Sequence, residues 1–94
     1  MTASAHPPVR ILLVDDSELV RRGIKTVLAA HDDPPLLVVA EAGTVADAVT
    51  LSLLHKPDIV LLDIRLPDGS GFIACRKILE SLPATHVIVL TSHA

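Results

Sequence analysis

Short runs of consecutive aliphatic residues recur along the chain, and segments with apolar residues at helical spacing separate them. The runs cover residues 9–14, which are apolar apart from Arg10, and residues 36–40, 59–62 and 87–90. Continuous apolar runs of this length are typical of strands buried on both faces of a parallel sheet. The pattern therefore predicts four strands of one parallel sheet.

Apolar residues at helical spacing predict three helices between these strands. Ser17 is a suitable N-cap for the first helix, and residues 31–35 end it because their two prolines cannot continue a helix. Thr44 opens the second helix in a loose capping box, and Pro83 ends the third. The three predicted apolar stripes are Val20, Ile24, Val27 and Leu28; Val45, Ala48, Val49, Ser52 and Leu53; and Phe72, Cys75, Leu79 and Leu82.

The alternation of strands and helices predicts the α/β class. Short connections and right-handed crossovers favour a doubly wound parallel sheet of the flavodoxin-like type, with strand order 2-1-3-4. The first helix then covers one face of the sheet, and the other two cover the opposite face. Residues 1–8 are polar and contain proline, so we expect a disordered leader before a single domain over residues 9–94.

Carboxylates follow two of the predicted strands at the point where each strand ends. Asp15 and Asp16 come directly after the first strand, and Asp63 comes directly after the third. The predicted strand order makes these strands neighbours, so the three side chains should meet at the carboxyl edge of the sheet, where open α/β sheets bind ligands. Thr91 ends the fourth strand and should border the same crevice.

Clustered carboxylates repel one another, so they either take up protons or bind a cation. A site of a few carboxylates with only oxygen ligands suits Mg²⁺, which keeps several waters and leaves room for a phosphate oxygen. An aspartate can attack phosphorus to form an acyl phosphate, and such a transfer depends mainly on positioning and charge compensation. The sequence therefore predicts Mg²⁺-assisted phosphoryl chemistry.

The composition excludes several other classes of function. A net charge of −3 gives no basic surface, which argues against direct binding of nucleic acid by this chain. Neither a secretion signal nor a membrane-length apolar run is present, and a lone cysteine, Cys75, rules out an internal disulfide. We expect a cytoplasmic domain without membrane contact, with Cys75 in the core.

Three segments, residues 12–16, 56–71 and 87–92, together resemble a bacterial two-component response-regulator receiver domain. Each segment includes the carboxyl end of a predicted strand, and the resemblance extends from about Val9 to Thr91. Residues 43–45 and 65–69 further resemble the subfamily of transcription factors with a C-terminal helix-turn-helix. The resemblance implies a phosphoacceptor in signal transduction rather than a classical enzyme.

By this resemblance, Asp63 is the phosphoacceptor. Asp16 would bind Mg²⁺ directly, Asp15 would bind it largely through water, and Asp63 and the backbone carbonyl of Arg65 would be further ligands. The phosphoryl donor would be a phosphohistidine on a sensor histidine kinase. DNA would be contacted only by an output domain outside these residues.

The resemblance also assigns roles to the end of the fourth strand. Thr91 would supply the hydroxyl that turns toward the phosphoryl group, and the backbone amide of Ser92 would face it. A receiver domain should continue with a fourth helix, a fifth strand that is followed by a lysine, and a fifth helix, none of which the 94 residues provide. The strand over residues 87–90 should then expose an apolar edge, and we expect self-association through it.

Two alternatives to the receiver interpretation remain open at this point. One is an aspartyl-nucleophile phosphatase of the haloacid-dehalogenase type, although Asp15-Asp16-Ser17 lacks the Asp-x-Asp pattern of those enzymes. The other is an unphosphorylated interaction module with a vestigial acidic site. We interpret Asp58 as a structural turn residue, Asp68 as a turn residue for which local hydrogen bonding is favoured, and Arg21 and Arg22 as an exposed helix face.

Overall fold

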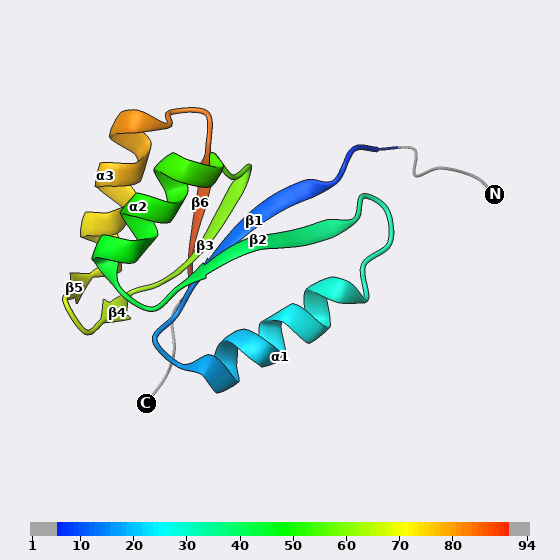
Figure 1. The fold of residues 1–94 in the computed structure, drawn as a ribbon, viewed down its shortest axis with the longest axis horizontal. Helices are drawn as coiled ribbons and strands as arrows, with labels where there is room; N and C mark the ends of the chain where they lie inside the picture. The colour runs from blue at the N-terminus through cyan, green and yellow to red at the C-terminus, as the bar shows by residue number, and fades with distance from the viewer. Residues whose placement is uncertain (1–5, 91–94) are drawn as a thin grey trace.

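The four strands of the main sheet alternate with three helices along the chain, as predicted. A computed structural model describes residues 6–90, and Figure 1 shows their arrangement. In chain order the elements are β1 (Val9–Val14), α1 (Glu18–Ala29), β2 (Leu36–Ala42), α2 (Val45–His55), β3 (Ile59–Asp63), β4 (Arg65–Leu66), β5 (Gly69–Ser70), α3 (Gly71–Ser81) and β6 (His86–Leu90).

The main sheet has four parallel strands in the order β2-β1-β3-β6. This order confirms the predicted flavodoxin-like winding. The register places Val14 of β1 opposite Leu62 of β3, and Asp63 opposite Leu90 of β6. The carboxyl ends of β1, β3 and β6 therefore lie side by side at one edge of the sheet.

Helices cover both faces of the sheet, with α2 and α3 on one face and α1 on the other (Figure 1). The main hydrophobic core lies between the sheet and the α2–α3 pair. It is aliphatic throughout, because the chain contains no tryptophan or tyrosine and a single phenylalanine. Its buried members are Leu12, Val14, Ala42, Val45, Ala48, Val60, Leu62, Leu66, Ala74 and Ile78.

The face covered by α1 is packed much less closely. The helix contains no buried residue, and Val20 and Val27 are 44% and 73% exposed. The predicted stripe was therefore wrong for these two residues, whereas Ile24 and Leu28 are half-buried. A helical period shows which face is apolar, but it cannot show how much partner surface is available. Here α1 packs mainly against β2, which is an edge strand of the sheet.

The apolar stripes of the other two helices also needed correction. Val45, Ala48 and Ser52 of α2 are buried as predicted, but Leu53 is 46% exposed. The prediction for α3 was wrong for Phe72, which is 60% exposed, whereas Cys75 and Leu82 pack against the core. The fully buried residues of this helix are Gly71, Ala74 and Ile78. Each helix carries apolar residues on two adjacent faces, and packing selects the face whose small residues, such as Ala48 and Ala74, allow close approach. Partly buried Cys75 packs against this core, as expected.

A short antiparallel hairpin, formed by β4 and β5, was not predicted. Arg65 pairs with Ser70, and Leu66 pairs with Gly69. Gly69 has φ +152°, a conformation that favours glycine. Strands of two residues are too short to show a period of hydrophobicity, so the segment resembled a simple loop. β2 is also longer than predicted and continues to Ala42.

The chain ends bear on two further expectations. Residues 1–5 of the predicted leader lie outside the described residues. His6 is described, and its Nδ1 lies 3.2 Å from Asp33 Oδ1 in the connection before β2. Within residues 6–90, no helix is both long and apolar enough to cross a membrane.

Candidate functional site

Three carboxylates meet at the carboxyl edge of the sheet. Asp15 and Asp16 follow β1, and Asp63 is the last residue of the neighbouring strand β3. One oxygen from each side chain lies within 4.8 Å of the others. The structure thus brings together the three aspartates that the sequence placed at one edge.

The three side chains differ in their surroundings. Asp63 is 8% exposed, whereas Asp16 is open to solvent. The pKa of Asp15 is raised above its ordinary value, first by burial and then by repulsion from Asp63 and Asp16. The backbone N–H of Ser17, which donates to Asp15 Oδ1 at 2.8 Å, opposes part of this rise in pKa. The cluster therefore carries an electrostatic penalty that a bound cation would relieve.

The donor set fits a hard divalent cation. All three side chains offer carboxylate oxygens, which Mg²⁺ prefers as ligands, and one oxygen of each lies within 4.8 Å of the others. The Arg65 backbone follows Asp63 closely, and its N–H donates to Asp63 Oδ1 at 3.4 Å. A ligand role for the Arg65 carbonyl stays a prediction.

Gly71 fits tightly against the backbone of the site. A Cβ at this position would overlap the carbonyl oxygen of Asp63 and lie 3.0 Å from the Cα of Ile64. The N–H of Gly71 donates to the Ile64 carbonyl at 2.6 Å. Helix α3 therefore begins in direct contact with the end of β3, which fixes the backbone that carries Asp63.

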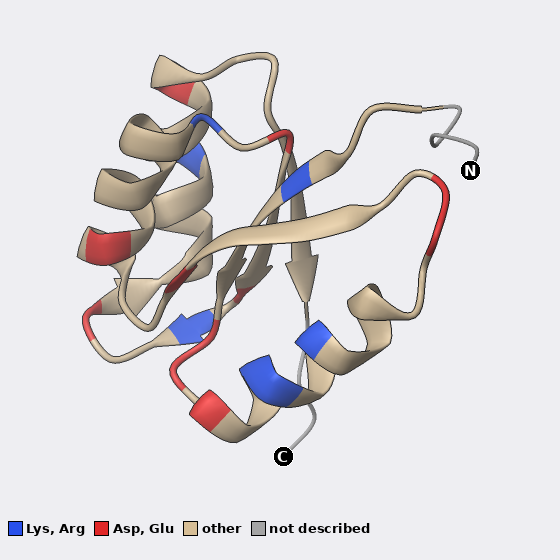
Figure 2. Cartoon of the chain, turned by 45° about the vertical axis from the view of Figure 1, so that its right-hand side comes forward, with Lys and Arg blue, Asp and Glu red and all other residues tan. Residues whose placement is uncertain are grey.

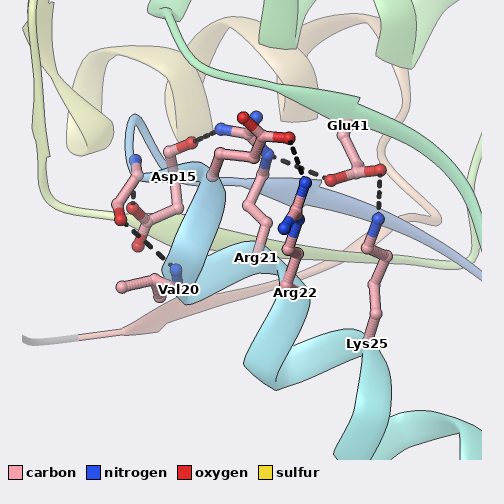
Figure 3. Close-up of polar contacts among 8 residues, drawn as sticks. Asp15, Val20, Arg21, Arg22, Lys25 and Glu41 are labelled. Atoms are coloured by element: carbon pink, nitrogen blue, oxygen red, sulfur yellow. Dashed lines mark hydrogen bonds and ion pairs between the residues drawn. The ribbon is translucent and has the colours of Figure 1, made fainter.

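An ion-pair cluster holds α1 against β2 beside the aspartates (Figure 3). Arg21 and Lys25 extend from α1 to the two oxygens of Glu41, at 3.0 and 2.8 Å. Arg21 Nη1 also donates to the backbone carbonyl of Asp15. Hydrogen bonds from Lys25, and then from Arg21, lower the pKa of Glu41. These contacts hold the connection that carries Asp15 and Asp16.

The prediction that Arg21 is exposed was wrong, because its side chain is only 18% exposed. Arg22 is 70% exposed and agrees with the prediction. The signal for the cluster was Arg21 and Lys25 at helical spacing opposite a glutamate within a strand. Figure 2 shows acidic positions where β1 leads into α1, followed by basic positions along the helix.

Asp68 makes a contact that the sequence did not indicate. Its carboxylate accepts hydrogen bonds from the backbone N–H groups of Val45 at 2.7 Å and Ala46 at 3.0 Å, both in the first turn of α2. These two bonds lower the pKa of Asp68. The interpretation of Asp68 as a turn residue therefore missed its contact with α2. Asp58, by contrast, is structural as expected, since it accepts a hydrogen bond from the backbone N–H of Arg10 at 2.9 Å.

The family profile described as the response regulator receiver domain matches residues 11–94. The chain belongs to this family. The match covers both aspartate-bearing strand ends and supports the receiver interpretation over the phosphatase alternative. Thr91 and Ser92 of the predicted receiver site lie outside the described residues, although Leu90, which precedes them, pairs with Asp63.

Relatives of this receiver domain include transcription regulators. The "DNA-binding transcriptional activator DevR/DosR" of Mycobacterium tuberculosis is 47% identical over 85 residues, which are 90% of this chain and 38% of the relative. A two-component response regulator of the LuxR family from Aurantimonas sp. SI85-9A1 has a TM-score of 0.82 at 36% identity, covering 93% of this chain and 61% of that one. The chain thus spans well under half the length of the curated relative.

A third similarity concerns a structure that contains ligands. A chain from the CheX-CheY-BeF3-Mg²⁺ complex of Borrelia burgdorferi has a TM-score of 0.83 at 25% identity, covering 93% of this receiver domain and 64% of that chain. Magnesium and a beryllium fluoride group are thus named for a protein that shares this fold.

Proposed function

We propose that this receiver domain accepts a phosphoryl group on Asp63 from a phosphohistidine of a sensor histidine kinase. The observation that carries the proposal is the convergence of Asp15, Asp16 and Asp63 within 4.8 Å, with Asp63 buried. In the transfer, a bond forms between a carboxylate oxygen of Asp63 and phosphorus as the P–N bond breaks. The donor imidazole keeps the electron pair of that bond.

Asp15, Asp16, Asp63 and the backbone carbonyl of Arg65 would hold Mg²⁺. Bound there, the ion would neutralise the carboxylates and the charge of the incoming phosphoryl group. The raised pKa of Asp15 supports a cation site, because it reflects burial and the mutual repulsion of the carboxylates. The presence of Mg²⁺ in the name of the Borrelia complex supports the choice of metal.

The chain's own residues would position the reacting groups. The Arg65 N–H and the Gly71–Ile64 hydrogen bond hold the backbone around Asp63. Arg21 and Glu41 hold the connection that carries Asp15 and Asp16. We further propose that the Thr91 hydroxyl and the Ser92 amide interact with the phosphoryl group once it is attached.

The output of phosphorylation would be transcription. DevR/DosR is named as a DNA-binding transcriptional activator, and the Aurantimonas structure belongs to the LuxR family. We propose that this receiver domain regulates a DNA-binding output domain of the same type. Its own charge of −3 is consistent with DNA contact through such a domain rather than through the receiver.

We also propose that the chain as given self-associates along β6. Among the described residues this strand pairs only with β3, and Ile88 on it is 46% exposed. An unpaired apolar edge promotes pairing between copies. Sedimentation velocity should show a concentration-dependent dimer that Ile88→Lys weakens and Val27→Lys, on exposed α1, does not. A monomer at all concentrations would contradict this proposal.

The decisive test of phosphorylation is intact mass after incubation with Mg²⁺ and a small-molecule phosphodonor. We expect one adduct of about 80 Da that hydroxylamine removes and that requires Mg²⁺. Asp63→Ala should abolish the adduct. Asp47→Ala, which replaces an exposed aspartate on α2, should retain it.

Two outcomes would contradict the assignment. One is an adduct of equal yield in Asp63→Ala, which would place the phosphoryl group elsewhere. The other is a folded parent chain that forms no adduct, which would favour the unphosphorylated interaction module.

A further inference from the structure

The tip of the β4–β5 hairpin is fixed to another element of the fold. This tip consists of Pro67 and Asp68, and the carboxylate of Asp68 bridges to the N–H groups of Val45 and Ala46. Gly69 of the hairpin also lies close to Val45, since a Cβ built on Gly69 would lie 3.6 Å from Val45 Cγ2. The hairpin therefore docks on the first turn of α2 through the two hydrogen bonds of Asp68.

The same hairpin leads directly out of the candidate phosphoryl site. Its first residue, Arg65, donates its backbone N–H to Asp63 Oδ1. The base of the hairpin is held by the hydrogen bond from Gly71 N–H to the Ile64 carbonyl, and Leu66 is 9% exposed in the core. Asp68 is thus the polar anchor at the end that lies farthest along the hairpin from Asp63.

We propose that Asp68 is a positioning residue for the Mg²⁺ and phosphoryl site. By clamping the hairpin to α2, it fixes the backbone of Arg65 next to Asp63. This inference rests on the proposed function, since it concerns the same site. It adds Asp68, which contacts α2, to the groups that determine the affinity for Mg²⁺. Asp68 does not touch the metal or the phosphoryl group; it acts through the hairpin.

The first turn of α2 can keep its position without this clamp. Thr44 caps the helix, since its Oγ1 accepts a hydrogen bond from the Asp47 N–H at 3.0 Å. Val45 is buried at 7% exposure and anchors the helix start in the core. Loss of the Asp68 carboxylate should therefore release the hairpin rather than unwind the helix.

The chemistry of the contact explains why a carboxylate is needed. Two adjacent N–H groups at a helix start point toward the hairpin, and a carboxylate offers an oxygen to each. An asparagine offers one acceptor oxygen and could bond only one of them well. If the clamp acts in this way, the affinity for Mg²⁺ should fall in steps from aspartate to asparagine to alanine at position 68.

The test is a Mg²⁺ titration of the 94-residue chain and its variants, followed by calorimetry and by ¹⁵N amide spectra. We expect Asp68→Ala to raise the dissociation constant for Mg²⁺ about tenfold, the lower end of the range for groups that orient metal ligands, and Asp68→Asn to raise it by a smaller factor. Asp47→Ala is the matched control. This substitution removes a carboxylate from the turn of α2 that Asp68 contacts, but it leaves the Asp68 hydrogen bonds in place. The affinity of Asp47→Ala for Mg²⁺ should therefore equal that of the parent.

The amide spectra separate positioning from a purely structural role. In Asp68→Ala we expect the Val45, Ala46 and Arg65 resonances to move while the remainder of the spectrum stays folded. A lower unfolding temperature with unchanged Mg²⁺ affinity would overturn the proposal, because Asp68 would then serve stability alone. Equal losses in Asp68→Asn and Asp68→Ala would also overturn it in favour of a simple charge effect.

Failure of the proposed function has a different signature. A folded parent chain that binds no Mg²⁺ would overturn both proposals together. A parent chain that binds Mg²⁺ with the same affinity as Asp68→Ala would overturn only the positioning role of Asp68.

Discussion

The two faces of the sheet are stabilised in different ways. On the α2–α3 face, ten buried apolar residues form a continuous core. On the α1 face, the helix has no buried residue, and its contact with β2 includes the Arg21–Glu41–Lys25 cluster. One face therefore relies mainly on close packing, whereas the other relies in part on charge.

This difference divides the candidate site. Asp63 ends a strand whose residues Val60 and Leu62 are fully buried in the core, and α3 begins against its backbone. Asp15 and Asp16 lie in the connection to α1, which the ion-pair cluster holds. The proposed phosphoacceptor Asp63 thus belongs to the well-packed part of the molecule. Two of the three proposed metal-binding aspartates, Asp15 and Asp16, belong to the part that is held by charged groups.

The largest difference in stability between the two faces is expected when the same substitution, isoleucine to alanine, is made in α3 and in α1. Ile78→Ala, in α3, should lower the free energy of unfolding by about 3–4 kcal/mol because its side chain is completely buried. Ile24→Ala, at a half-buried position of α1, should lower the free energy of unfolding by about 1 kcal/mol. Urea unfolding followed by far-ultraviolet circular dichroism measures both. Equal losses would show that α1 is packed as firmly as α3.

A smaller effect is expected for the ion-pair cluster. Glu41→Gln should lower the free energy of unfolding at neutral pH by about 1 kcal/mol, because the cluster is partly exposed. The folded-state pKa of Glu41 is lowered, so its stabilisation is present above the unfolded pKa and disappears as pH falls through the folded one. On acidification the parent should therefore lose the stability that the Glu41 ion pairs contribute, whereas Glu41→Gln has no such contribution to lose.

Salt provides the control for this interpretation. High ionic strength screens partly exposed charges, so it should narrow the difference between the parent and Glu41→Gln. Ile78→Ala should lose the same stability at low and high salt. A difference between parent and Glu41→Gln that did not depend on salt would mean that Glu41 acts through packing.

The smallest effect concerns the end of α2 on the packed face. Lys56 ends this helix with φ 48° and ψ 61°, a left-handed conformation that favours glycine. Arg10 Nη1 donates to the carbonyls of His55 and Lys56, at 2.7 and 3.1 Å, and holds this turn in place. Lys56→Gly should therefore raise the free energy of unfolding by about 0.5 kcal/mol. Thermal unfolding would detect the gain, and a loss would show that the lysine side chain contributes more than its backbone conformation costs.

The order of the elements and the sheet topology could be predicted from the sequence because they depend on local patterns. Consecutive aliphatic residues marked the strands, and the short connections limited the winding. The buried faces of the helices could not be predicted as reliably. Phe72 and Ala74 both lie on apolar stripes, and only the close approach of α3 to the core places the alanine inside and the phenylalanine outside.

The same distinction applies to the candidate site. Asp15, Asp16 and Asp63 could be placed together because each follows a strand, and strand order determines their meeting. The contacts of Arg21 with Glu41 and of Asp68 with α2 join segments 20 or more residues apart. The helical spacing of Arg21 and Lys25 indicates that they share a face of α1, but nothing in that segment identifies Glu41 as their partner, so these contacts required the tertiary structure.

Gly71 has a consequence for how this chain can vary. Because a single added carbon would overlap the Asp63 carbonyl, alanine is excluded for the same reason as tryptophan. In a saturation library, position 71 should tolerate glycine alone, and every other residue should give the same low yield of folded protein. At Asp68 the yields should instead be graded by side-chain chemistry. Uniform loss at position 71 would indicate that the available space limits the choice of residue there. Graded loss at position 68 would indicate that hydrogen bonding limits it.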